Sequence, residues 1–171
     1  QVLQEREALE RAAFELAEDA HKEQILYMEV RYCPALHTKR GLSMEETVEA
    51  VSAGLDRARR RYGIHTGTIV CGIRHLSPRL SLRLAELAVT YYGRGVVGFD
   101  LAGEEAGYPA VDHARAFQYA HKNFMKKTVH AGEAYGPESI FQAITDLYAD
   151  RIGHGSYLLE PDAISDPSIE D

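Results

Sequence analysis

The sequence has few cysteines, no long apolar run and no excess of basic residues. Cys33 and Cys71 are too few for a disulfide scaffold, and since both lie in apolar segments typical of strands, we expect reduced thiols in the core. No uncharged apolar run approaches the ~18–20 residues of a membrane span, so no membrane partner is expected. Asp and Glu number 26 against 19 Lys and Arg, a net charge of −7, which argues against nucleic-acid binding.

The chain also lacks an initiator methionine and a basic-then-apolar secretory leader. It begins at Gln1 inside a helical pattern and stops in a stretch rich in Pro and Asp, so we expect an internal fragment of a longer protein. Its 171 residues, 45% of them hydrophobic, predict a single, incomplete globular domain over residues 1–171. Reduced cysteines favour a cytoplasmic location, and no pattern indicates an oligomeric state.

Several motifs of other enzyme classes are missing. No G-x-G-x-x-G opens a helix, and the G-x-x-x-x-G-K-[ST] phosphate loop is absent, so a dinucleotide site has little support. There is no G-x-S-x-G elbow of a serine hydrolase. The cysteines lack C-x-x-C spacing, which argues against a zinc–thiolate site.

The apolar pattern alternates between strand and helix periods. The predicted strands are residues 25–32, 68–73, 95–100, 127–130 and 151–154. Five helices are predicted. The first has an apolar face over 9–20, and the second begins at the capping box Ser43–Glu46 and ends at Gly63. The third and fourth have apolar faces over 80–91 and 110–124, and the fifth starts at Pro137 and continues to Tyr148. A last helix is expected to open at Glu160–Asp162.

Strands that alternate with helices predict an α/β fold with parallel strands and right-handed crossovers. A doubly wound sheet and a (β/α)8 barrel both fit the pattern alone. Because a complete barrel takes about 250 residues, this chain would form only part of one.

Ionisable side chains follow each predicted strand, at the end where parallel β/α folds bind ligands. They are Glu29 and Arg31, Arg74 and His75, Asp100, His130 and Glu133, and His154. A sheet core does not require such groups. Histidines and carboxylates at one end of the strands predict metal-assisted or general acid–base chemistry.

Some of these groups also have a plain structural interpretation. His75 is more simply a loop histidine, and Glu104 with Glu105 fits a solvated charge run. Four further histidines are expected on the surface: His37, His65, His113 and His121. Buried histidines with backbone partners would explain His130 and His154, but the glycines beside them favour close approach of a ligand.

Four segments resemble one known family. Thr128–Glu133 followed by Gly153–Gly155 resembles the signature of the adenosine deaminase family, and residues 27–34, 72–75 and 100–105 match three more of its segments in order. The resemblance covers nearly the whole chain. It implies a partial (β/α)8 TIM barrel with about five parallel strands and intervening helices, the first and last barrel strands lying outside the chain.

The family converts adenosine or deoxyadenosine to the inosine form with release of ammonia, and it uses Zn²⁺. The resemblance implies that His130 is a zinc ligand and that Glu133 protonates purine N1 while water adds to C6. It implies that His154 orients or deprotonates the zinc-bound water. A small purine nucleoside is therefore the expected partner. The H-x-x-E spacing differs from the H-x-E and C-x-x-C pattern of nucleic-acid deaminases.

The same resemblance gives roles to four other residues. Gly103 corresponds to the residue whose backbone N–H meets purine N3. Asp100 is expected behind the metal, in contact with a ligand rather than with the ion. Arg31 and Arg74 are expected to support the site without reacting.

Two parts of the family pattern are absent from these residues: a His-x-His pair and an Asp-Asp pair. Zinc needs about three protein ligands plus water, and this segment offers one from the family set. We therefore predict that residues 1–171 alone are inactive and bind zinc weakly. Two other hypotheses remain: a related amidohydrolase-superfamily deaminase of adenine or an N6-modified purine, and a non-catalytic barrel fragment that acts as a binding module.

Overall fold

The computed structural model describes residues 2–160 and divides them into two compact units. Unit 1 contains the described residues up to Val70 together with Thr90–Val97. Unit 2 contains Cys71–Val89 and the described residues from Gly98 onward. The helix expected at Glu160–Asp162 extends beyond the described residues.

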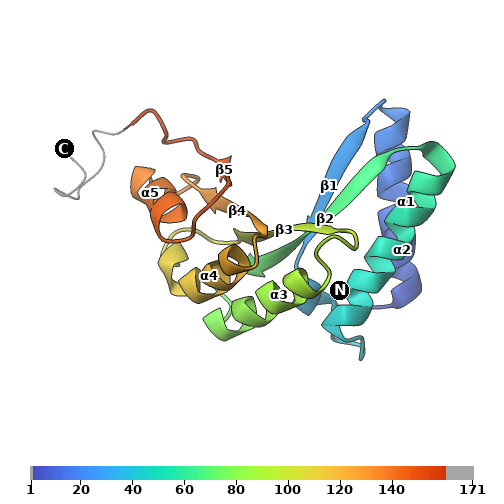
Figure 1. The fold of residues 1–171 in the computed structure, drawn as a ribbon, viewed down its shortest axis with the longest axis horizontal. Helices are drawn as coiled ribbons and strands as arrows, with labels where there is room; N and C mark the ends of the chain where they lie inside the picture. Colours follow the sequence, from blue (N-terminus) through green and yellow to red (C-terminus); the bar gives the residue numbers. More distant parts are fainter. Residues whose placement is uncertain (1, 161–171) are drawn as a thin grey trace. The chain divides into compact units, whose positions relative to one another are not determined.

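The strands form a five-stranded sheet whose order follows the sequence (Figure 1). They are β1 (Tyr27–Tyr32), β2 (His65–Ile73), β3 (Val96–Ala102), β4 (Lys126–Ala131) and β5 (Arg151–His154). The pairs β1/β2, β3/β4 and β4/β5 are parallel. A doubly wound sheet would reverse its strand order at a switch point. The sequential order with helical crossovers therefore confirms a partial (β/α)8 barrel.

Unit 1 is built on two long helices that lie side by side along β1 and the start of β2 (Figure 1). These are α1 (Arg6–Lys22) and α2 (Met44–Tyr62); the 3-10 helix η1 (Pro34–His37) lies between β1 and α2. The predicted capping box is present, because the Ser43 hydroxyl accepts from the Glu46 amide and the Glu46 carboxylate accepts from the Ser43 amide. Gly63 ends α2 in the left-handed conformation, as predicted.

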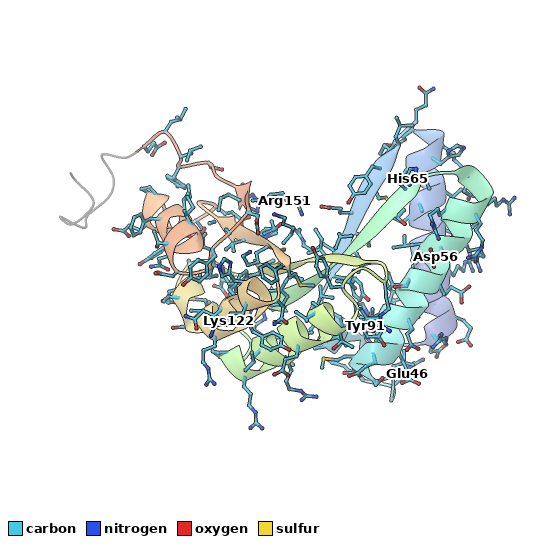
Figure 2. The ribbon with its side chains drawn as sticks, viewed as in Figure 1. Glu46, Asp56, His65, Tyr91, Lys122 and Arg151 are labelled. Atoms are coloured by element: carbon cyan, nitrogen blue, oxygen red, sulfur yellow. The ribbon has the colours of Figure 1, made fainter. Side chains whose placement is uncertain are left out.

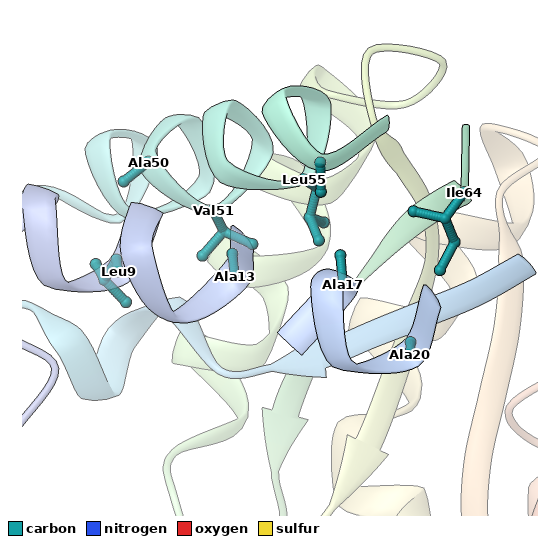
Figure 3. Packing of buried hydrophobic residues seen from close by; sticks show 9 residues of the cluster. Leu9, Ala13, Ala17, Ala20, Ala50, Val51, Leu55 and Ile64 are labelled. Atoms are coloured by element: carbon teal, nitrogen blue, oxygen red, sulfur yellow. The ribbon is translucent and has the colours of Figure 1, made fainter. Parts of the chain in front are cut away.

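The core of unit 1 is apolar and made mostly of small side chains (Figure 3). Its buried members are Leu9, Ala13, Ala17, Ala20, Ala50, Val51, Leu55, Ala58 and Ile64. Alanines on the facing sides of α1 and α2 let the two helices approach closely, and the larger Val51 and Leu55 fill the space between them and the strands.

Unit 2 contains the remaining helices. They are α3 (Pro78–Thr90, whose last residue belongs to unit 1), the 3-10 helix η2 (Ala110–His113), α4 (Ala114–Lys122) and α5 (Pro137–Thr145). Phe99 of β3 packs against Phe117 of α4 with ring centroids 5.0 Å apart, and both rings are fully buried. Pro137 is the first residue of α5, as predicted. Within residues 2–160, no helix is both long and apolar enough to span a bilayer.

Two predicted helix faces extend too far. Phe124 does not belong to the α4 face: its side chain is 87% exposed and its φ is +57°. The Met125 amide donates to the Ala120 carbonyl, which closes the helix with a left-handed residue at position 124. Likewise α5 ends at Thr145, and Tyr148 has a φ of +54°. Both cysteines are buried and form no disulfide, as expected, and burial raises the pKa of the Cys33 thiol.

Candidate active site

Two histidines of unit 2 lie together at the ends of β4 and β5. The strand register places His130 opposite Gly153 and Ala131 opposite His154. The two imidazole rings lie 5.3 Å apart between centroids, at 65° to each other. A Cβ added at Gly153 would lie 3.2 Å from Cγ of His130, so glycine there allows the ring to rest on the neighbouring backbone.

Glu133 completes this pair from the loop after β4. Its Oε2 lies 3.5 Å from Nε2 of His154, and the Glu133 and His154 side chains are 52% and 39% exposed. His154 has a φ of +66°, a conformation that is uncommon for a residue with a side chain and that often occurs at functional sites. The structure therefore brings together the three residues that the sequence predicts for metal binding and proton transfer.

Asp100 lies behind His130. Nδ1 of His130 is 3.2 Å from an Asp100 carboxylate oxygen and 3.2 Å from the Leu101 carbonyl, and Asp100 is fully buried. Both partners are acceptors, so Nδ1 donates, and in the neutral ring it is Nε2 that offers a lone pair. Metal-binding histidines typically show this arrangement, with the second nitrogen held by a carboxylate. The donor set at His130 therefore fits a metal ligand.

Arg74 is buried at the end of β2 and supports the same residue. Its Nη2 donates to the His130 carbonyl and its Nη1 to the Tyr108 carbonyl, both at 2.7 Å. Burial lowers the pKa of the guanidinium, and three carboxylates, Glu105, Asp100 and Glu133, oppose that shift. This is the kind of contact expected for a residue that supports the site without reacting.

His113 was expected on the surface, and that prediction is wrong. The side chain is 2% exposed, with Nδ1 2.7 Å from the Ser81 hydroxyl and Nε2 3.0 Å from the Arg74 carbonyl. Because a carbonyl only accepts, Nε2 donates to it and Nδ1 accepts from Ser81. Burial lowers the pKa of His113, which agrees with a neutral ring. Its place at the end of η2 turns it inward, and no spacing signal in the sequence predicts that.

Three other predicted residues have simpler settings. Gly103 follows β3, and it is exposed with a φ of +97°. His75 is an exposed turn residue after β2 whose ring meets Tyr108 edge-on, as expected for a loop histidine. Arg31 lies on β1 in unit 1, exposed and in register with Ile69, so it is not among the side chains that unit 2 brings together.

The pair Glu104 and Glu105 is not simply a solvated charge run. Glu104 is exposed, whereas Glu105 is 4% exposed and accepts hydrogen bonds from the loop that contains Glu133. The sequence gives two adjacent acidic residues after a strand and no sign of which one turns inward. Only the position of the β4–α5 loop distinguishes them.

No cluster of three or more His, Cys, Asp or Glu side chains that could hold a metal occurs within residues 2–160. His130, the residue that the sequence predicts as a ligand, has the Asp100 carboxylate behind it. A separate cavity of about 530 Å³ lies in unit 1, lined by the first residues of β2 and β3 and by α2. It contains none of the predicted site residues. His65 and Asp56, two of its lining residues, are labelled in Figure 2.

Comparison with known proteins gives one consistent result. The family described as adenosine deaminase matches residues 1–167. Adenosine deaminase 1 of Streptomyces coelicolor is 45% identical over 164 residues, which cover 93% of this chain and 41% of that protein. The chain thus spans less than half the length of this relative.

Solved structures agree on the fold. Adenine deaminase from Arthrobacter aurescens matches with a TM-score of 0.84 and 26% identity, over 98% of this chain and 49% of that one. An amidohydrolase from Burkholderia ambifaria with bound Zn matches with a TM-score of 0.88 over 94% of this chain and 45% of that one, and at 23% identity it supports the fold alone.

Proposed function

The chain belongs to the adenosine deaminase family, and we propose that the full-length protein is a zinc-dependent aminohydrolase that converts adenosine or deoxyadenosine to inosine or deoxyinosine and releases ammonia. The observation that supports this most directly is the Glu133 carboxylate 3.5 Å from the His154 ring, at the same strand ends as His130. A small purine nucleoside is the proposed partner. A cytoplasmic location is proposed from the two buried cysteines, which form no disulfide.

His130 would hold Zn²⁺ through Nε2, with Asp100 fixing the ring from behind. The remaining ligands are expected outside residues 1–171. When bound, the ion lowers the pKa of water to about 7, which makes hydroxide available at neutral pH. The Asp100 contact fits this role because it orients the ring and makes the free nitrogen more basic.

The proton transfers are assigned to the other two side chains. Addition of water to purine C6 places negative charge on N1, and the Glu133 carboxyl group donates a proton there. His154 accepts a proton from the attacking water and passes it to the amino group, which leaves as ammonia when the C6–N bond breaks. The C6 hydroxyl then becomes the carbonyl, and its proton restores the Glu133 carboxyl group. Both side chains are partly exposed, as groups that meet a substrate must be. The Gly103 N–H is assigned to purine N3, while Arg74 supports the site from within unit 2.

The second candidate is deamination of adenine or an N6-modified purine by the same groups. Because the fold resembles that of the adenine deaminase of Arthrobacter aurescens, adenine is the alternative substrate to compare with the nucleosides. A barrel that lacks further zinc ligands and acts as a binding module is the non-enzymatic alternative.

Steady-state assays of the full-length protein separate these functions. Loss of the 6-amino group is followed by ultraviolet absorbance with adenosine, deoxyadenosine and adenine as substrates. We expect the nucleosides to give much higher kcat/KM than adenine. The reverse order would support the adenine hypothesis, and absence of turnover with all three by the zinc-loaded protein would support the binding module. Residues 1–171 alone should show neither turnover nor stoichiometric zinc.

Two variants test the metal and proton roles of the histidines. His130→Ala should lose zinc, measured by elemental analysis, because it removes a ligand. His154→Ala should keep zinc and lose rate. Loss of zinc from His154→Ala would instead make that residue a ligand.

A further inference from the structure

Glu105 is a buried acidic residue of unit 2 that the proposed chemistry does not use. It lies in the loop after β3, five positions beyond Asp100, and its side chain is 4% exposed while its neighbour Glu104 is exposed. Burying a carboxylate is costly unless hydrogen bonds satisfy its oxygens. Its hydrogen-bond partners therefore indicate what the residue does.

The partners are consecutive backbone amides of the β4–α5 loop, residues 132–136. The donors to the carboxylate are the amides of Gly132 at 2.8 Å, Glu133 at 2.9 Å, Ala134, and Tyr135 at 3.0 Å. The Ser139 hydroxyl in the first turn of α5 donates to it as well. These donors lie 27 to 34 positions away along the chain. One carboxylate thus holds four of the five residues between β4 and α5.

The loop backbone is shaped to receive a negative charge. Gly132 has a φ of +70°, and a Cβ there would lie 2.7 Å from Cδ1 of Ile140, so only glycine fits this turn. The turn lets successive amides converge on one point, which forms an anion-binding concavity. The point also lies at the amino end of α5, where the helix dipole favours negative charge.

The hydrogen bonds keep Glu105 charged despite its burial. Burial by itself would raise the pKa of the carboxyl group. The Ser139 hydroxyl and the amides of Ala134, Gly132 and Tyr135 outweigh it and hold the pKa below its ordinary value. The carboxylate is therefore ionised at neutral pH and accepts from all its donors at once.

The loop that Glu105 holds contains Glu133. The Glu133 amide donates to Glu105, while the Glu133 carboxylate lies 3.5 Å from His154. Because its backbone is held in place, the position of the Glu133 carboxylate depends only on the rotamer of the Glu133 side chain. Such prior positioning matters in catalysis, where a misplacement of about 1 Å can cost about 100-fold in rate.

We propose that Glu105 is a positioning residue, whose buried carboxylate holds the β4–α5 loop so that the Glu133 carboxyl group meets the substrate. The catalytic part of this proposal rests on the proposed function. The structural part, that Glu105 keeps the loop amides hydrogen-bonded, stands independently of it.

The test uses the zinc-loaded full-length protein with Glu105→Gln and a matched control, Glu104→Gln. Both changes remove one negative charge, but only the first places an amide NH₂ among amide donors. Hydrogen–deuterium exchange of peptides that cover residues 131–139 reports on the loop, and kcat and KM for adenosine report on the chemistry. Zinc content and the cooperative thermal transition show whether each variant is folded and loaded.

We expect Glu105→Gln to exchange faster over residues 132–135 and to lose about 100-fold in kcat, with KM within about threefold of wild type. Glu104→Gln should match wild type in every measurement. Wild-type exchange and kcat in folded Glu105→Gln would overturn the proposal. The proposal would also be overturned if loss of zinc or unfolding of the variant fully accounted for the fall in kcat. An equal fall in kcat in Glu104→Gln would overturn it as well.

If Glu105→Gln does not fold, Ser139→Ala decides the matter, because it removes a single donor and keeps the carboxylate. It should raise exchange over residues 132–135 and lower kcat by a few-fold, and wild-type behaviour would overturn the proposal. A wild-type protein without adenosine turnover would contradict the proposed function alone. Exchange in the variants would then still decide whether Glu105 holds the loop.

Discussion

Unit 1 and unit 2 bury different kinds of side chain. In the part of unit 1 that the structure describes, the buried polar residues are neutral: Gln4, Thr47 and Thr68. Its ion pairs, such as Arg57–Glu10 and Arg40–Glu5, lie on the surface. Among the described residues of unit 2, by contrast, the buried polar set is Arg74, Ser81, Asp100, Glu105, His113, Lys127, His130 and Ser139. Burial of charge is expensive. Three of these groups, Arg74, Asp100 and Glu105, contact His130 or the Glu133 loop, whereas Lys127 lies at the start of β4 beside Asp150.

The two units also differ in how the start of a helix is held. In unit 1 the amino end of α2 is capped by Ser43 and Glu46, three positions apart on the same segment. In unit 2 the loop before α5 is held by Glu105 from a distant loop. A local cap stabilises a helix wherever it forms, whereas a distant one also fixes the loop to another strand end. Packing of unit 1 should therefore affect stability alone, and the buried charges of unit 2 should affect stability and chemistry together.

The largest expected effect is on chemistry in unit 2. Glu133→Gln in the full-length protein should lower kcat about 10²- to 10⁴-fold, because an amide cannot donate the proton that N1 requires. Zinc content and thermal stability should stay at wild-type values, since the side chain is half exposed. Steady-state kinetics with adenosine measure this. Turnover near the wild-type rate would remove Glu133 from its assigned role.

The next effect is on stability in unit 1. Leu55→Ala should lower the free energy of unfolding by about 3 kcal/mol, because it opens a cavity beneath α2 where the side chain is buried. Urea denaturation measures the change, and Leu55→Met, which preserves volume, should cost about 1 kcal/mol. At temperatures where the variant is folded, kcat should not change. A large fall in kcat would show that unit 1 packing also shapes the site.

A smaller effect tests a buried charge of unit 2. Nζ of Lys127 lies 2.7 Å from Oδ2 of Asp150, and the lysine is buried while the Asp150 side chain is 30% exposed. Asp150→Asn should cost about 2 kcal/mol of unfolding free energy, less than for a fully buried pair, because the ammonium loses its counter-charge. An unchanged stability in urea would show that water reaches Lys127.

The same pair predicts a pH dependence. Burial would raise the pKa of Asp150, but hydrogen bonds from Lys127 and Lys126 lower it to about 2. Because the folded-state pKa lies below the unfolded one, the stabilisation is complete above about pH 4 and is lost as the pH falls toward 2. Between these values, the unfolding free energy of Asp150→Asn should change less steeply with pH than that of wild type. Parallel slopes would contradict this assignment.

The smallest effect concerns the local cap of unit 1. Ser43→Ala should cost about 1 kcal/mol, because the Glu46 amide loses its acceptor. Ser43→Thr retains the hydroxyl and serves as the control. A loss comparable to that of Leu55→Ala would mean that α2 depends on its cap as much as on its packing.

The sequence predicts local features of the molecule well and distant contacts poorly. The capping box, the Gly63 end and the strand positions follow from residues within a few places of one another, and the structure confirms them. Adjacency of His130 and His154 also follows, because neighbouring parallel strands end together. Burial of His113 and Glu105 depends on partners at least 27 positions away, so no short pattern reveals it.

The glycine opposite His130 has a consequence for how this protein tolerates change. A methyl group at position 153 would press on the imidazole ring from 3.2 Å, so the ring would have to move and its contact with Asp100 would be disturbed. In a saturation-mutagenesis screen that scores growth on a purine, substitutions of Gly153 should therefore be about as damaging as substitutions of His130. The residue would behave as part of the proposed metal site although it contributes no functional group.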